Sequence, residues 1–158
     1  MVLLRSPILS NGIRNCIFPF RSQRRQLLAG RQVVKLLLDT HAFLWLNNQP
    51  ERLSPAIQTL CMAGEHDFYL SMASAWEMQI KCQLGKLALD LPIMELVSQG
   101  CDKNGILLLN IELAHIDMLG KLPDRHKDPF DRLLIAQSMV EGITLLTADE
   151  LVAQYPGP

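Results

Sequence analysis

The 158-residue sequence lacks long apolar runs and paired cysteines. A membrane-spanning helix needs about 18 to 20 successive apolar residues, and no stretch of this sequence is that long. No two cysteines form a CxxC pair or follow a metal-ligand spacing, which is typical of small buried side chains in a reducing compartment. We therefore expect a cytoplasmic protein without membrane spans or disulfides, whose cysteines are Cys16, Cys61, Cys82 and Cys101.

Several motifs of enzyme chemistry are also missing. The sequence has no P-loop, no GxGxxG and no evident pairing of serine or cysteine with histidine, which leaves little support for nucleotide-fold chemistry or covalent acyl transfer. We interpret Trp45 and Trp76 as core residues rather than as platforms for stacked bases. The histidines follow no HxxxH or similar spacing, so we interpret each as structural or solvated; they are His41, His66, His115 and His126.

Acidic residues are absent from the first 32 positions, which contain six arginines. The remaining residues hold nine basic side chains and all 16 acids, a formal net charge of −7. Non-specific affinity for nucleic acid comes from phosphates neutralised by lysine and arginine. An acidic domain of this kind therefore needs bound cations or a basic partner before it can act on a polyanion.

Residues 1–32 show no sustained helical or strand period, so we separate them from a single domain over residues 33–158. Their composition, rich in arginine and serine without acids, overlaps that of an organellar transit peptide. We favour a basic extension upstream of the native start, with the working protein beginning near Val34. A basic arm that contacts RNA is a third alternative. In each case we expect this segment to be poorly ordered.

Short apolar runs alternate with helical patterns along the rest of the chain. This alternation, without hairpin signals, predicts a parallel α/β sheet with helices on both faces. Strands are predicted over residues 34–38, 66–71, 106–109 and 143–146. Helices are predicted over residues 41–48, 55–63, 73–83, 92–99, 111–119, 129–141 and 147–154, with Gly100 ending the fourth of them.

Asp39 directly follows the most apolar predicted strand, VKLLL. Open α/β sheets bind their ligands beside the carboxyl ends of strands, and a carboxylate after buried leucines needs a partner or a cation there. Asp39 could instead cap the following helix. We favour a functional role, with the adjacent Thr40 in support.

Glu77 lies one turn into the helix that follows the second predicted strand. The alternative for Glu77 is an exposed (i, i+4) ion pair with Lys81, which contributes only about 0.3–0.5 kcal/mol. We favour a functional role because the first turns of this helix overhang the same sheet edge as Asp39.

Two acids flank Pro129 and Phe130 in the sequence HKDPFDR. Asp128 is predicted to cap the helix that starts at Pro129, and Asp131 lies in its first turn, where acids interact favourably with the helix dipole. Asp131 precedes the apolar run LLIA, which must pack on the sheet and would hold its carboxylate rigidly. We favour Asp131 for chemistry and Asp128 for support.

Asp149 lies just past the last predicted strand. Thr147 and Glu150 have the spacing of a capping box, which accounts for both of them but not for Asp149. We therefore predict that four acids converge and are catalytic: Asp39, Glu77, Asp131 and Asp149. Asp39, Asp131 and Asp149 are the predicted metal ligands, and Thr147 supports them.

Four carboxylates at one edge repel one another and raise each other's pKa values. They are tolerated together when a hard cation shares the site, and Mg²⁺ and Mn²⁺ prefer oxygen ligands. Such an ion activates a water and stabilises the charge that develops on a phosphate. The sequence thus favours hydrolysis of a phosphodiester with one or two metal ions. A phosphatase that uses Asp39 as nucleophile is disfavoured, because Asp39 lacks the second acid of a DxD loop.

Three stretches together resemble the PIN-domain family, specifically VapC-like toxins of bacterial toxin–antitoxin pairs: VKLLLDTHAFLWL, SMASAWEMQIKCQLGKL and HKDPFDRLLIAQSMVEGITLLTADE. The resemblance implies a three-layer α/β/α fold with strand order 3-2-1-4-5, and a ribonuclease that depends on Mg²⁺ or Mn²⁺. It further implies a cognate antitoxin and a homodimer. The family's acids fall on Asp39, Glu77, Asp131 and Asp149, while Asp128 matches its HxDPFDR pattern and Thr147 its Ser/Thr before the last acid.

The sequence departs from the family pattern at both ends. Residues 1–32 lie outside the pattern, and the chain stops at YPGP, where relatives continue into an edge strand. We therefore expect the last edge strand to be short or missing. The alternative to a toxin nuclease is a catalytically silent PIN module that binds an antitoxin or RNA without turnover.

Overall fold

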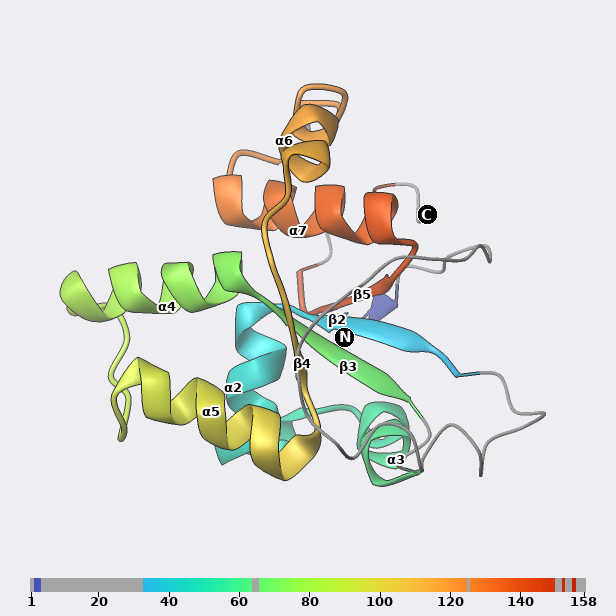
Figure 1. Ribbon diagram of the computed structural model, residues 1–158. Coiled ribbons are helices and arrows are strands. Elements are labelled where there is room, and N and C mark those ends of the chain that lie inside the picture. Colours follow the sequence, from blue (N-terminus) through green and yellow to red (C-terminus); the bar gives the residue numbers. More distant parts are fainter. Residues whose placement is uncertain are drawn as a thin grey trace.

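The four predicted strands form a parallel sheet in the computed structural model (Figure 1). They are β2 (Lys35–Leu38), β3 (Asp67–Ser71), β4 (Leu107–Leu109) and β5 (Thr144–Thr147). The spatial order is β4-β3-β2-β5, so the predicted order 3-2-1-4 is confirmed. The structure describes residues 2–3, 33–63, 66–124, 126–149, 152 and 155.

A fifth strand comes from the amino-terminal segment. The backbone of β1 (Val2–Leu3) pairs antiparallel with the outer edge of β5, with Val2 opposite Thr147 and Leu3 opposite Leu146. The edge at which we expected a short or missing carboxyl-terminal strand is therefore occupied by β1. Apart from Val2 and Leu3, residues 1–32, for which we predicted poor order, lie outside the described residues.

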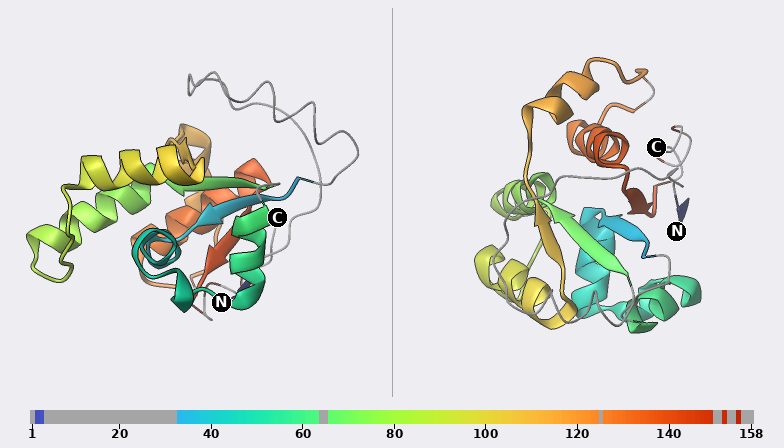
Figure 2. Two further views of the ribbon diagram at one scale, coloured as in Figure 1. Left: turned by 90° about the horizontal axis from the view of Figure 1, so that it is seen from below. Right: turned by 45° about the vertical axis from the view of Figure 1, so that its right-hand side comes forward.

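Helices cover both faces of the sheet, which gives the predicted three-layer α/β/α fold (Figure 2). One layer contains α6 (Leu113–Leu119) and α7 (Pro129–Glu141). The opposite layer contains α2 (Thr40–Asn48), the 3₁₀ turn η1 (Pro50–Arg52), α3 (Pro55–Ala63), α4 (Met72–Gln83) and α5 (Ile93–Asn104). No helix in the described part of the chain has the length and apolar character needed to cross a bilayer.

The central strand β2 supplies side chains to the cores on both faces of the sheet. Leu37 packs with α7 residues in one cluster, whereas Leu36 and Leu38 pack in the other cluster with Phe43 of α2. Successive residues of a strand point to opposite faces, which explains why all three leucines are buried. A strand buried on both faces holds its carboxyl end, and so Asp39, in a fixed position.

Helix α5 is longer than the sequence predicted. Gly100 does not end it; the helix continues to Asn104 and ends at Gly105, which has a left-handed backbone conformation (φ 63°). Gly100 has a packing role instead, because a Cβ atom there would lie 2.7 Å from Cε2 of the buried Phe43. A glycine that allows close helix packing was thus misinterpreted as a helix terminator.

Two further sequence expectations change. Trp45 packs partly buried beside one core cluster, but Trp76 is 57% exposed, so its interpretation as a core residue is wrong. Thr147 belongs to β5 rather than to a last helix. Half of the helix predicted over residues 147–154, including Glu150 of the expected capping box, lies outside the described residues.

Candidate active site

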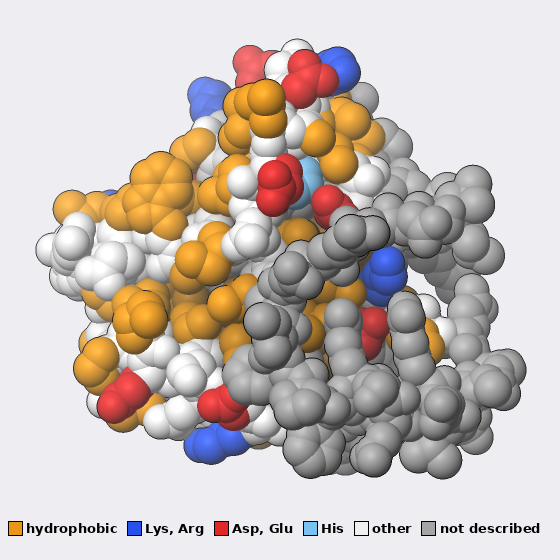
Figure 3. Space-filling model, viewed as in Figure 1, with side chains coloured by type: hydrophobic (Ala, Val, Ile, Leu, Met, Phe, Trp, Pro, Cys, Tyr) orange, Lys and Arg blue, Asp and Glu red, His pale blue; other side chains and the backbone are white. Residues whose placement is uncertain are grey.

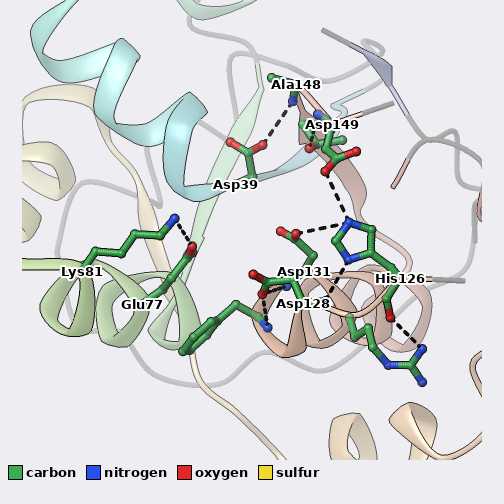
Figure 4. A network of polar contacts seen from close by, with 11 residues as sticks. Asp39, Glu77, Lys81, His126, Asp128, Asp131, Ala148 and Asp149 are labelled. Atoms are coloured by element: carbon green, nitrogen blue, oxygen red, sulfur yellow. Dashed lines mark hydrogen bonds and ion pairs between the residues drawn. The ribbon is translucent and has the colours of Figure 1, made fainter. Parts of the chain in front are cut away.

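The carboxyl ends of three neighbouring strands lead directly into the predicted acids. Asp39 follows β2, α4 with Glu77 follows β3, and Asp149 lies two residues past β5. Asp131 reaches the same place from the first turn of α7. The four side chains surround one space, which Figure 4 shows from close by.

Asp39 is both a helix cap and a link between two strands. Its Oδ1 accepts a hydrogen bond from the Ala42 amide of α2 at 2.6 Å, so the alternative that Asp39 caps this helix is confirmed. Its Oδ2 accepts from the Ala148 amide, which follows β5, at 3.2 Å. Asp39 is 6% exposed. Each carboxylate oxygen has two lone pairs, so these bonds fix the carboxylate and leave it able to bind a cation.

Glu77 is buried, although it forms the ion pair that we expected of an exposed residue. It is 6% exposed; its Oε1 lies 2.5 Å from Nζ of Lys81, and its Oε2 accepts a hydrogen bond from Oγ1 of Thr40. Thr40 is also buried. The Thr40 hydroxyl thus connects the residue after Asp39 with the glutamate on α4, and Lys81 balances the glutamate charge.

Asp128 caps α7, as predicted. Its Oδ1 accepts hydrogen bonds from the amides of Phe130 at 2.8 Å and Asp131 at 3.4 Å. These bonds satisfy amides that have no partner within the helix. Asp128 is exposed, so it positions the start of α7, and with it Asp131, from outside the enclosed site.

Asp131 has the most perturbed environment of the acids. Burial, the largest cause, and the nearby charges of Asp128, Glu77 and Asp149 together raise the pKa of its carboxyl from 3.8 to about 6, while His126 acts in the opposite direction. The causes that raise the pKa outweigh the single histidine that opposes them. The protein alone therefore leaves negative charge at this edge undercompensated.

His126 joins Asp131 and Asp149, and the sequence reasoning missed it. One ligand atom from each of the three residues lies within 4.8 Å of the others, a spacing that could hold a metal ion. Nε2 of His126 is 3.3 Å from Oδ2 of Asp149 and 3.6 Å from Oδ2 of Asp131. His126 thus lies in a group that could hold a metal ion, which its spacing along the sequence did not indicate.

The hydrogen bonds of His126 define its part in this group. The Asp128 amide donates to Nδ1 at 3.3 Å, so Nδ1 carries no proton and the neutral ring carries its proton on Nε2. Nε2 then donates to Asp149. In this arrangement His126 orients the carboxylates, and the oxygens of Asp131 and Asp149 are the donors that suit a hard divalent cation.

Thr147 and Arg132 hold the surrounding backbone. The Thr147 hydroxyl accepts a hydrogen bond from the Asp149 amide at 3.0 Å, which fixes the turn after β5. The Arg132 guanidinium of α7 donates to four carbonyl oxygens of the segment that leads to His126: those of Leu119, Leu122, Pro123 and His126. Arg132 is therefore occupied in tying this loop to α7.

The sequence contained part of the signal that His126 belongs to the site. His126 lies two residues before Asp128 in the HKDPFDR motif, and this proximity to two acids was the available signal. Nothing in the spacing along the chain indicates that residues 126 and 149 meet, because the contact depends on how α7 and β5 pack.

The fold and the site together define a nuclease-like α/β/α domain with a carboxylate cluster at the carboxyl edge of its sheet. The family model of the PIN domain matches residues 36–158. Because this match covers well over half of the chain, the protein belongs to the PIN-domain family. PIN domains are generally nucleases and typically bind divalent metals. No curated protein matches the sequence.

Proposed function

We propose that the protein is a metal-dependent endoribonuclease that hydrolyses RNA phosphodiester bonds. The observation that carries the proposal is that acids from four separate segments surround one space: Asp39, Glu77, Asp131 and Asp149. The cation would be Mg²⁺ or Mn²⁺, which bind through one or two carboxylates, waters and substrate phosphate.

Each residue has a defined task in this proposal. Asp131 and Asp149 provide the metal-binding oxygens, and Asp39 faces them from the end of β2. His126 orients the two aspartates, and Thr40 with Lys81 holds Glu77 as a further negative charge. A bound cation would supply an activated water and would stabilise negative charge on the phosphate oxygens. The undercompensated charge around Asp131 is what such a cation would neutralise.

We further propose that the protein is the toxin of a toxin–antitoxin pair, acts in the cytoplasm, forms a homodimer and is held inactive by a cognate antitoxin. The VapC-like motifs support this role. Expression of the wild-type protein, but not of Asp131→Asn, should then arrest growth, and co-expression of a protein encoded in the adjacent reading frame should restore it.

The nuclease activity is tested with purified full-length protein and single-stranded RNA in Mg²⁺ or Mn²⁺. We expect cleavage that a chelator abolishes and that Asp131→Asn reduces at least about 100-fold, since even the hydrogen-bonding partners of metal ligands typically contribute 10- to 100-fold. Asp117→Asn is the matched control, because Asp117 is an exposed acid paired with Lys121 on α6. Cleavage by Asp131→Asn at the rate of the control would contradict the mechanism.

One observation favours the alternative of a silent PIN module. Both oxygens of Asp39 accept backbone amides, and both oxygens of Glu77 are engaged by Thr40 and Lys81. Each oxygen keeps a second lone pair, so this alternative requires that the contacts hold Asp39 and Glu77 too far from a cation. The domain would then bind its antitoxin or RNA without turnover. Tight RNA or antitoxin binding with no metal-dependent cleavage is the result that would favour this alternative.

A further inference from the structure

Trp76 exposes a large aromatic side chain on α4, in contact with the first turn of α7. It precedes the buried Glu77 on α4, yet 57% of its surface is accessible. Tryptophan buries more apolar area than most side chains when it is covered. Its exposure at this position therefore suggests a ligand that covers it.

A second aromatic residue fixes the position of Trp76. The Phe130 ring meets the Trp76 ring edge to face, with centroids 5.3 Å apart and an interplanar angle of 81°. Phe130 precedes Asp131 just as Trp76 precedes Glu77. Consecutive Cα atoms are about 3.8 Å apart, so each ring is one residue from an acid of the site.

The charge of the domain favours a nucleobase as the ligand. Residues 33–158 carry a formal net charge of −7, so they have few cations to neutralise phosphates, which is the usual source of RNA affinity. The Lys81 and Arg132 side chains near the site are occupied by Glu77 and by backbone carbonyls. Stacking of a base on an aromatic ring needs no positive charge and accepts any base sequence.

We propose that Trp76, oriented by Phe130, stacks a base of single-stranded RNA next to the phosphodiester that the acids cleave. This proposal rests on the proposed ribonuclease function and adds the binding site for a base. The base would lie on the exposed surface of Trp76. The adjoining phosphate would enter the space between Glu77 and Asp131, two acids that Figure 4 labels.

A protein partner on α4 is the competing explanation. Figure 3 shows hydrophobic side chains gathered where α4 lies in Figure 1. Met72, one turn before Trp76, is 40% exposed, and Leu84, two turns after it, is 63% exposed. A partner helix along α4 would use Leu84 as well as Trp76, whereas a base beside the acids would use Trp76 alone. Leu84 is therefore the matched control.

The test measures binding of a single-stranded oligoribonucleotide to full-length protein with Asp131→Asn, which slows turnover. We expect Trp76→Ala to weaken binding about tenfold, the scale of one stacked base. Trp76→Phe should retain most of the affinity, and Leu84→Ala all of it. In a Trp45→Phe background, where Trp76 is the remaining tryptophan, RNA should quench the tryptophan fluorescence.

The remaining outcomes overturn the stacking proposal, either alone or together with the nuclease function. If Trp76→Ala binds RNA as tightly as its parent while the wild-type protein cleaves RNA, the stacking proposal fails and the nuclease function stands. If the wild-type protein neither binds nor cleaves RNA, both proposals fail. Equal weakening by Leu84→Ala, or a changed oligomeric state of Trp76→Ala, would identify a protein-binding face and overturn the stacking proposal.

Discussion

Asp131 lies partly buried at the start of α7, where other carboxylates and one imidazole surround it. Burial disfavours its charged form, and the neighbouring negative charges disfavour it further, so its pKa rises to about 6. A carboxylate that binds a cation must be ionised. The protein thus maintains, at this position, a negative charge that is unfavourable until a cation balances it.

This environment predicts a pH-dependent stability in the absence of metal. The folded protein holds the Asp131 proton up to about pH 6, whereas the ordinary pKa of the group is 3.8. Between these values the folded state binds more protons than the unfolded state, so stability falls as the pH rises. We expect Asp131→Asn to match the wild type near pH 4 and to exceed it at pH 7 by on the order of 1–2 kcal/mol.

Urea denaturation in the presence of a chelator, at pH 4 and pH 7, measures this difference. Asp117→Asn, a change at an exposed acid, should alter stability by less than about 0.5 kcal/mol at both pH values. A loss of stability at pH 7 in Asp131→Asn would mean that the ionised carboxylate stabilises the fold.

The sequence indicated the residue types of the site better than their surroundings. The Glu77–Lys81 ion pair followed from helical spacing, but the burial of Glu77 and its bond to Thr40 depend on how α4 packs against α2. The Asp39 cap could be predicted because it is local, and the hydrogen bond from Ala148 could not, because it joins residues 109 positions apart.

At the scale of elements, Gly100 shows how a glycine inside a helix can be misinterpreted. Its missing side chain lets α5 approach the buried ring of Phe43 on α2. The helix continues because the packing gained there outweighs the low helix propensity of glycine, about 1 kcal/mol relative to alanine. No local pattern distinguishes such a glycine from one that ends a helix.

We predict that Gly100→Ala destabilises the protein by about 1–3 kcal/mol, the typical cost of overpacking a core. The added methyl group would lie 2.7 Å from the ring of the fully buried Phe43, so the ring or α5 would have to shift. Gly120→Ala is the control, since a Cβ atom there would lie 3.5 Å from the Asp117 carbonyl oxygen, an ordinary contact distance. Thermal unfolding of both variants measures the difference, and equal melting temperatures would contradict this account of α5.

At the scale of the whole molecule, the sheet has an edge that the amino-terminal segment covers. β1 pairs with β5 on the side away from β2. Uncovered strand edges expose amide and carbonyl groups that can pair with another chain. The four acids all lie after residue 33, so β1 supplies none of them and pairs with the edge of β5 opposite Thr147.

A variant that begins with methionine followed by Val34 tests both parts of this statement. We expect it to retain metal-dependent RNA cleavage, since every site residue remains. We also expect a melting temperature lower by a few degrees and more self-association at high concentration, because the edge of β5 is open. Unchanged stability and a monodisperse solution would show that β1 does not protect this edge.

The parallel strands could be predicted because they are short apolar runs that alternate with helices, as Lys35–Leu38 before α2 and Asp67–Ser71 before α4 illustrate. The family motifs supplied the order. The antiparallel β1 could not be predicted, because two residues of backbone pairing leave no periodic pattern. The meeting of His126 with Asp149 was likewise hidden, since it depends on packing between distant segments.

The central claim is that the converging carboxylates form one divalent-cation site. A crystal of the full-length protein grown with Mn²⁺ tests it most directly through the anomalous signal of the metal. We predict an ion at direct coordination distance, about 2.1 Å, from oxygens of Asp131 and Asp149, in the space that Asp39 and Glu77 face. Saturating Mn²⁺ that leaves this space empty, or binds only elsewhere, would contradict the account.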